Sequence, residues 1–349
     1  MPMEYDALLI VSFGGPEKPE DVMPFLENVT RGRRIPRERL EEVAEHYYHF
    51  GGKSPINEQV AALIAALRVE LAAHGPDLPI YLGNRNWQPY LADTMRQMKA
   101  DGVKRALAFI TSAWSSYSSC RQYLDNITEA QAAVGEGAPE VVRLRLFYNH
   151  PGFLETMGER VRDAYAGLPD DLRGGAPLLF TAHSIPMSMS ENCRYVSQLT
   201  EACGLVAQLA RRDHWRLVYQ SRSGPPTQPW LEPDIGDALK EIAATGGKSV
   251  VIAPIGFLSD HMEVMYDLDY EAKHLCDELG LTMARAGTVG HHPRFVTMIR
   301  ELITERVHGA ERKALGPHGA MPDVCFIGCC PAPMLVQGGG AGRISPGRG

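Results

Sequence analysis

The sequence predicts an α/β protein that contains two open parallel β-sheets of four strands each. Short aliphatic runs alternate with segments of helical periodicity, and most runs are apolar at every position, as expected of parallel strands that helices cover on both faces. The eight runs are Ala7–Ser12, Ile80–Gly83, Arg105–Thr111, Val141–Phe147, Pro177–Ala182, Arg216–Gln220, Ser249–Pro254 and Leu281–Arg285. Eight strand–helix units could also close into a barrel. We favour two sheets, with the chain crossing between them near His150-Pro151.

Helical periodicity between the strands predicts the layers that cover these sheets. The predicted helices are Asn57–Ala73, Tyr90–Ala100, Gly152–Ala166, Val196–Arg211 and Met262–Leu279. A further helix begins at Pro293 and could return to the first sheet. We therefore expect an N-terminal domain (1–150, with the returning helix 293–310), a C-terminal domain (151–292), a cysteine-rich segment (320–330) and a disordered tail (331–349).

The composition of the 349-residue chain excludes several classes of protein. Hydrophobic residues make up 44% and charged residues 22%, close to the globular average, which argues against a wholly disordered chain. The net charge of −7 does not suit a nucleic-acid binder. No apolar run approaches the roughly 18 residues of a membrane span, and the start Met1–Asp6 is acidic, unlike a signal peptide. We expect a cytoplasmic protein without a transmembrane segment.

His183 is the first candidate catalytic residue, because it follows an apolar strand directly. In open parallel sheets, ligands bind beyond the carboxyl ends of the strands. A neutral imidazole at that place can accept a proton or bind a metal ion. The alternative is a strand-end histidine that makes only a structural hydrogen bond.

Three carboxylates spaced by four residues, Glu263, Asp267 and Glu271, follow the strand Ser249–Pro254. On a helix they would form one row. Like charges in a row repel one another, so the row is either a solvated surface stripe or part of a site that binds a cation. Its position after a strand end favours the site, and imidazole with carboxylates suits Fe²⁺ or a similar divalent ion.

Two loops carry further candidate ligand-binding residues. Ser54 follows Gly51-Gly52 and precedes Pro55, the pattern of a helix start, where Ser54 would cap the helix or help to bind an anion. The segment 111–123 gathers hydroxyl and aromatic residues, which suits either a flat ligand with polar edges or ordinary loop packing. The chain carries no P-loop and no G-x-G-x-x-G pattern, so nucleotide binding has little support.

Cys325, Cys329 and Cys330 supply three thiols within six residues. Three thiolates and a distant fourth would satisfy a [2Fe–2S] cluster, whereas an adjacent pair does not suit a zinc ribbon. The alternative is three thiols with no ligand. The odd total of seven cysteines argues against a disulfide framework.

Taken together, these segments resemble the ferrochelatase family, whose members insert ferrous iron into a porphyrin. The matching stretches, in order, are LLIVSFGGPEKPEDVMPFLENVTRGRRIP, HFGGKSPIN, TSAWSSYSSCRQY, FTAHSIP, YQSRSGPPTQPWLEPD and PIGFLSDHMEVMYDLDYEA. The resemblance implies two Rossmann-like domains with the porphyrin between them. It is closest to the actinobacterial and Gram-positive branch, whose members generally use coproporphyrin III.

The resemblance also assigns roles to residues. His183 and Glu263 match iron-binding positions, and Ser54 and Tyr123 match positions that contact porphyrin propionates. The fourth cluster ligand of that branch matches Cys120.

Three positions depart from the pattern of some relatives. Phe13 stands where a tyrosine can contact the metal, and Thr30 and His46 replace arginines near the propionates. Arg31 and Arg33 remain as candidates to supply that charge.

The implied function is insertion of Fe²⁺ into coproporphyrin III in heme biosynthesis, with His183 as base and Asp267 and Glu271 relaying protons or guiding the metal. Transient contact with neighbouring heme-pathway enzymes is also expected. The alternatives are a protoporphyrin IX ferrochelatase, a cobalt or nickel chelatase for a related ring, and a non-catalytic porphyrin carrier or iron–sulfur sensor. A carrier needs no carboxylate row, so the row favours an enzyme.

Overall fold

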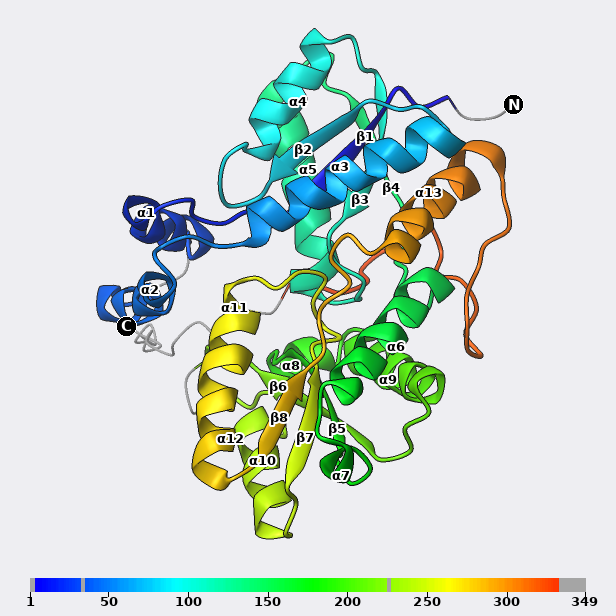
Figure 1. Ribbon diagram of the computed structural model, residues 1–349. Helices are drawn as coiled ribbons and strands as arrows, with labels where there is room; N and C mark the ends of the chain where they lie inside the picture. The colour runs from blue at the N-terminus through cyan, green and yellow to red at the C-terminus, as the bar shows by residue number, and fades with distance from the viewer. Residues whose placement is uncertain (1–3, 33–34, 225–226, 333–349) are drawn as a thin grey trace, which may run out of the picture.

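The computed structural model, which describes residues 4–32, 35–224 and 227–332, contains two four-stranded parallel sheets (Figure 1). The first has the order β2-β1-β3-β4 and the second β6-β5-β7-β8. The predicted fold class is therefore confirmed, and the barrel alternative is wrong. The strands are β1 (Ala7–Ser12), β2 (Ile80–Asn84), β3 (Arg105–Ile110), β4 (Glu140–Arg143), β5 (Leu178–His183), β6 (Trp215–Gln220), β7 (Ser249–Ala253) and β8 (Thr282–Arg285).

Helices cover both faces of each sheet, which is why the central strands β1 and β7 are buried at every position. The first half of the chain contributes α1 (Pro19–Val29), α2 (Arg37–His49), α3 (Ile56–His74), α4 (Leu91–Ala100), the π-helix η1 (Tyr117–Arg121) and α5 (Gln122–Val134). The second half contributes α6 (Pro151–Ala166), α7 (Asp170–Arg173), α8 (Met187–Ser190), α9 (Tyr195–Ala210), α10 (Ile235–Ala244), α11 (Met262–Val264), the π-helix η2 (Met265–Ala272) and α12 (Lys273–Leu279).

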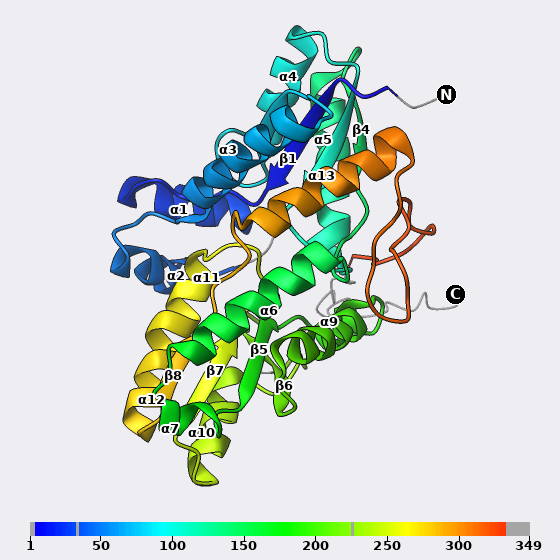
Figure 2. The same cartoon turned by 45° about the vertical axis from the view of Figure 1, so that its right-hand side comes forward.

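The last helix, α13 (Pro293–His308), packs against both α3 and α6 (Figures 1 and 2). Arg300 of α13 donates from Nε to Glu70 of α3 at 2.8 Å. Phe295 packs on Phe109 of the first sheet and on Phe153 of α6. One hydrophobic core therefore joins the two sheets. The domain limits at residues 150 and 292 stay a prediction.

Two predicted elements differ from the structure. The predicted strand Val141–Phe147 ends at Arg143, because the chain then leaves the sheet toward α6. The predicted helix Met262–Leu279 is α-helical only at its ends, and its middle is η2. A π-helix places hydrogen bonds from i to i+5, and such segments are frequent at functional sites.

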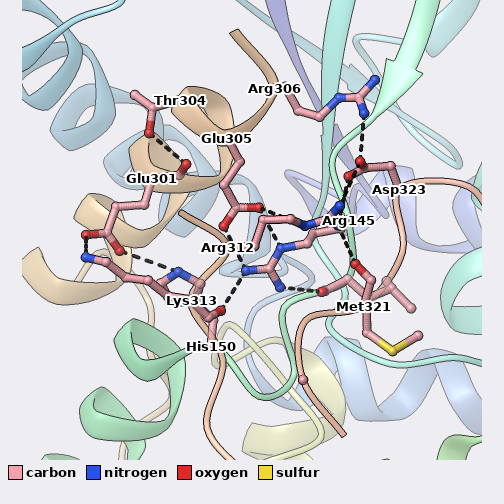
Figure 3. Close-up of polar contacts among 12 residues, drawn as sticks. Arg145, His150, Glu301, Thr304, Glu305, Arg306, Arg312, Lys313, Met321 and Asp323 are labelled. Carbon is pink, nitrogen blue, oxygen red and sulfur yellow. Dashed lines mark hydrogen bonds and ion pairs between the residues drawn. The ribbon is translucent and has the colours of Figure 1, made fainter. Parts of the chain in front are cut away.

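A buried ion pair holds α13 and the chain after it against the first sheet (Figure 3). Arg145 is 1% exposed and bonds both carboxylate oxygens of Glu305, which is 4% exposed, at 2.7 and 2.8 Å. The Arg145 guanidinium also donates to the backbone oxygen of Lys313 at 2.7 Å. Farther along, Asp323 pairs with Arg306 at 2.8 Å and with Arg312 at 3.2 Å. These contacts place the segment that carries Cys325.

Among the helices of the described residues, none has both the length and the apolar character that crossing a membrane requires. The predicted disordered tail at 331–349 lies, apart from its first two residues, outside the described part of the chain.

His150 caps α6 at the crossing between the sheets and is fully buried. Its Nδ1 accepts the Gly152 N–H at 3.1 Å, and burial, with Arg145 and Lys313 nearby, lowers the pKa of His150 to about 3. The imidazole therefore stays neutral in the folded protein, whereas an unfolded chain binds a proton there below about pH 6.5. The folded state, which holds His150 neutral, is therefore at no disadvantage above pH 6.5, and it loses stability relative to the unfolded chain as the pH falls from 6.5 toward 3.

Between pH 7 and pH 5, the free energy of unfolding of the wild type should fall by about 2 kcal/mol more than that of His150→Asn. The reason is that asparagine keeps a capping oxygen but does not titrate. Urea unfolding at the two pH values measures the difference. The exposed His214 provides the matched control, since His214→Asn should follow the wild-type profile. Parallel pH profiles for wild type and His150→Asn would contradict the prediction.

Candidate functional site

The ends of β5 and β6 bring the candidate residues of the second sheet to one edge. His183 is the last residue of β5 and lies opposite Gln220, the last residue of β6. The chain that follows β7 supplies Glu263 on α11, and Asp267 and Glu271 on η2. This is the carboxyl edge of a parallel sheet, where a ligand site is expected.

His183 is held at two points, one on its imidazole and one on its backbone. Its Nδ1 contacts the backbone oxygen of Ser184, which can only accept, so Nδ1 carries the hydrogen. Nε2 then carries the free lone pair. The hydroxyl of Tyr195 donates to the backbone oxygen of His183 at 3.0 Å, which holds the strand end in place.

Glu263 faces that lone pair. Its Oε2 lies 3.8 Å from His183 Nε2, and the two side chains are 46% and 33% exposed. His261 caps α11 by accepting the Glu263 N–H at its Nδ1, at 3.2 Å. A metal ion bonds nitrogen and carboxylate ligands at about 2.0–2.2 Å, so one cation could bridge these two atoms.

Asp267 lies behind Glu263 and is held by the end of β6. Ser221 Oγ donates to its carboxylate, and Gln220 Nε2 donates to it at 3.2 Å. Ser221 adopts a left-handed conformation (φ 59°), which is uncommon for serine and marks a constrained position. Burial raises the pKa of Asp267 to about 7, although the Ser221 hydrogen bond acts against the shift. Asp267 can therefore gain or lose a proton near neutral pH.

Glu271 lies farther along η2 and is exposed. Partial burial, and then repulsion from Asp234, raises its pKa. A pocket of about 510 Å³ is lined by Asp234 and by Ser184, the neighbour of His183. That pocket is not lined by His183 or Glu263, so we take the His183–Glu263 contact, rather than this pocket, as the centre of the site.

Aromatic residues of α2 cover the outer face of η2. His46 stacks on Tyr266 with ring centroids 3.6 Å apart, and His49 packs on Tyr270 at 4.3 Å. The ring of Tyr47 is turned inward, where burial and then the charge of Glu263 raise its pKa. Helix α2 of the first half therefore reaches the carboxylate row of the second.

The residues matched to propionate contacts lie in the first half of the chain. Ser54 is 3% exposed beneath Gly15, and its Oγ accepts the Ile56 N–H at 3.5 Å; the residue that caps α3 is Pro55, not Ser54. Tyr123 is the second residue of α5 and is buried beneath the guanidinium of Arg85.

The predicted arginines near the propionates are only partly placed. Arg31 is exposed in the turn after α1, and Arg33 lies outside the described residues. Thr30, which stands where some relatives carry arginine, donates its hydroxyl to the backbone oxygen of Leu26 at 2.7 Å.

The cysteines predicted to bind a cluster approach one another from distant parts of the chain. Arg143 donates to Cys120 Sγ at 2.6 Å and to Cys325 Sγ at 3.4 Å. The thiol of Cys120 lowers the pKa of Cys325 to about 4 by hydrogen bonding, and the Arg143 charge adds to this shift. Cys329 interacts in turn with Cys325 and Cys330. Cys325 has the only lowered pKa among these four thiols: the hydrogen bond to Cys325 raises the pKa of Cys120, and burial raises the pKa of Cys329 and of Cys330.

No three histidine, cysteine, aspartate or glutamate side chains of the described residues are placed to hold one metal ion. This arrangement does not suit a closed zinc site, which takes four protein ligands on one ion. Nor do the described residues show a group that binds a cluster, so the [2Fe–2S] cluster stays a prediction.

Sequence reasoning missed the residues that hold the site together. Gln220 and Ser221 could have been found by the signal that identified His183, which is a polar residue where an apolar strand ends. Tyr195 carries no such signal, because a tyrosine at the start of a helix is typical of the hydrophobic core.

The chain is similar in sequence to several characterised proteins. A family model described as Ferrochelatase matches residues 5–307. The chain is 58% identical to the ferrochelatase of Rhodopirellula baltica, over 93% of this chain and 93% of the relative. It is 52% identical to the coproporphyrin III ferrochelatase of Streptomyces griseus (99% and 98% covered) and 53% identical to that of Streptomyces coelicolor (98% and 97% covered).

Solved structures with a similar fold include a chelatase. SirB from Bacillus subtilis with Fe³⁺ has a TM-score of 0.55 at 12% identity, over 88% of this chain and 97% of SirB. The sirohydrochlorin chelatase SirB from Bacillus subtilis subspecies spizizenii, in complex with cobalt, has a TM-score of 0.51 at 12% identity, with the same coverage. At this identity the likeness shows the fold alone.

Proposed function

The chain belongs to the ferrochelatase family, and from this premise we propose that it inserts Fe²⁺ into coproporphyrin III in heme biosynthesis. The observation that carries the proposal is the His183–Glu263 pair, whose Nε2 and Oε2 atoms face each other at 3.8 Å beyond the end of β5. Relatives at 52–53% identity over nearly the whole chain are named for this activity.

The chemistry requires a base and a metal ligand at one place, because two pyrrole N–H protons leave the ring as Fe²⁺ enters. His183 Nε2 carries the free lone pair and acts as the base. Glu263 holds the cation beside it, and its negative charge favours the approach of Fe²⁺.

Protons taken up by His183 must leave the site. Asp267 lies next to Glu263 and titrates near pH 7, so it can accept and release protons at neutral pH. Glu271, exposed and farther out on η2, completes the row toward solvent. The row supplies a route outward for protons, or inward for the metal.

The choice of coproporphyrin III over protoporphyrin IX rests on charge. Coproporphyrin III carries four propionates and needs polar partners for each, and Ser54, Tyr123, Arg31 and Arg33 are the candidates from the resemblance. Each charge-assisted hydrogen bond contributes about 1.5–3 kcal/mol.

We also propose a [2Fe–2S] cluster held by Cys120, Cys325, Cys329 and Cys330. Support comes from the convergence of these thiols and from the Arg143 guanidinium, which contacts two of the sulfurs and offsets negative charge. When bound, the cluster would cross-link the C-terminal segment to η1. Insertion of a metal into a porphyrin transfers no electron, so the reaction itself does not require the cluster.

A cytoplasmic location and transient contact with neighbouring heme-pathway enzymes belong to the same proposal. The contact is expected because the product is a large flat macrocycle that a second protein must take over.

Anaerobic Fe²⁺ insertion, followed by the change in porphyrin absorbance, tests the function. We expect kcat/KM for coproporphyrin III to exceed that for protoporphyrin IX at least tenfold, since two additional charge-assisted contacts are made. His183→Ala should bind porphyrin but insert no iron. Faster turnover of protoporphyrin IX would favour the alternative substrate, and normal turnover of His183→Ala would remove His183 from the mechanism.

Glu263→Gln should lower the rate of insertion more than Glu271→Gln does. Glu263 faces His183, whereas Glu271 lies two turns farther along the helix. We expect a loss of about 100-fold or more for the first variant and less than tenfold for the second, measured as kcat at saturating porphyrin. Equal small losses would mean that the row is only a solvated helix face.

Protein purified without oxygen should be brown and contain about two irons and two acid-labile sulfides per chain. Cys120→Ser should bleach this colour and lower the melting temperature, because the cluster ties two segments together. Cys276→Ser, which changes a buried cysteine of α12, is the matched control and should keep the colour. A colourless anaerobic preparation without labile sulfide would contradict the cluster and leave the chelatase proposal intact.

A further inference from the structure

Arg85 is a cation at the carboxyl edge of the first sheet that the proposed mechanism does not use. It follows β2 directly, and its N–H donates to the backbone oxygen of Ser12, at the end of β1, at 3.0 Å. Arg85 therefore lies at the edge of the first sheet that corresponds to the position of His183 in the second.

The side chain of Arg85 is held in a fixed place. Its guanidinium carbon lies 4.3 Å from the ring centre of Tyr123 and 5.6 Å from that of Phe13. Its Nε donates to Asn126 Oδ1 at 2.7 Å. Both rings stand at positions that the family resemblance places against the porphyrin or its metal.

The charge of Arg85 has no counter-ion within the described residues, where no carboxylate lies within ion-pair distance of it. The side chain is only partly buried, so its terminal nitrogens can reach a ligand. An arginine presents several N–H groups in a planar fork that matches the two oxygens of a carboxylate. The described contacts use only the Nε–H of this fork.

The ring beneath Arg85 is itself held by further aromatic contacts. Phe13, beneath Arg85, packs edge-on against Phe25 with ring centroids 6.2 Å apart, and Phe25 packs against Tyr47 at 5.9 Å. Phe25 is 1% exposed and belongs to the core cluster against which Tyr47 packs. Phe13 thus joins the surface around Arg85 to the core of the first half of the chain.

Two positions where some relatives carry arginine supply no guanidinium in this chain. Thr30 has no charge and is bonded to its own helix, and the His46 ring is stacked on Tyr266. Burial lowers the pKa of His46, and the charge of Arg39 adds to this shift. Another cation in the first half of the chain would therefore add to the charge proposed for Arg31 and Arg33.

We propose that Arg85 binds a propionate carboxylate of the porphyrin substrate, a role that rests on the proposed function and adds a residue to it. Tyr123 and Asn126 act as positioning residues that hold the guanidinium in place. The strength of binding then depends on the negative charge of the substrate edge.

The test compares Arg85→Met, which keeps the apolar stem and removes the charge, with wild type in fluorescence titrations of coproporphyrin III. We expect Kd and KM to rise about 10- to 100-fold, because a charge-assisted contact is lost, and kcat to change by less than threefold. Arg85→Lys keeps the charge and should retain most of the affinity.

Two controls separate binding from packing. Arg212 lies over the ring of Tyr165 at 3.6 Å in the second half of the chain, so Arg212→Met removes a similar stack away from the site and should leave Kd unchanged. The tetramethyl ester of coproporphyrin III, titrated in detergent, carries no carboxylate, and wild type and Arg85→Met should bind it within about twofold of each other.

The outcomes are distinct. An unchanged Kd for coproporphyrin III in Arg85→Met, an equal loss for the ester, or an affinity for Arg85→Lys as low as that for Arg85→Met would each overturn the role of Arg85 and leave the proposed function standing. A wild-type protein that neither binds nor metallates coproporphyrin III would overturn the proposed function and this role together. If Arg85→Met does not fold, Arg85→Gln replaces it in the same comparison.

Discussion

The buried pair of Arg145 and Glu305 is the contact on which the placement of α13 and the chain after it depends. Removing two charges from water costs several kcal/mol for each, so such a pair persists only when its hydrogen bonds are complete. Here Arg145 uses both carboxylate oxygens of Glu305 and the backbone oxygens of Lys313 and Leu146. These bonds fix α13 beside the first sheet. They also direct the chain after α13 toward Cys120, so the helix and the cysteine segment are positioned together.

The site follows from the parallel order of the strands. Each sheet delivers its polar strand-end residues to one edge, and contacts between the halves bring these edges together. Gln59 of α3 exchanges two hydrogen bonds with the backbone of Asp260, and Trp114 donates to the backbone oxygen of Gly256. Because Asp260 lies three residues before Glu263, the first half of the chain helps to place the metal-binding carboxylate of the second.

Local patterns were sufficient to predict the sheets but not the support of the site. Strand β1 reads as apolar at every position, and its predicted limits match the structure. His183 could be found because it interrupts such a run. By contrast, α2 is largely polar with one fully buried residue, and it was missed because its stability comes from rings that pack on η2. The π-helical form of η2 also has no signature in the spacing of Glu263, Asp267 and Glu271. The approach of Arg143 to two sulfurs 205 residues apart in the chain depends on tertiary packing that no local pattern encodes.

The Arg145–Glu305 pair also sets an order of events during synthesis. The two residues are 160 positions apart, so the ribosome releases Arg145 long before its partner. Until Glu305 emerges, the guanidinium has to remain solvated, and the edge of the first sheet near β4 has to remain open to water. Final closure of this half therefore waits for Glu305, although most of its strands and helices are complete by residue 143. The segment that carries Cys325 follows Glu305 in the chain, so it is synthesised after both members of the pair.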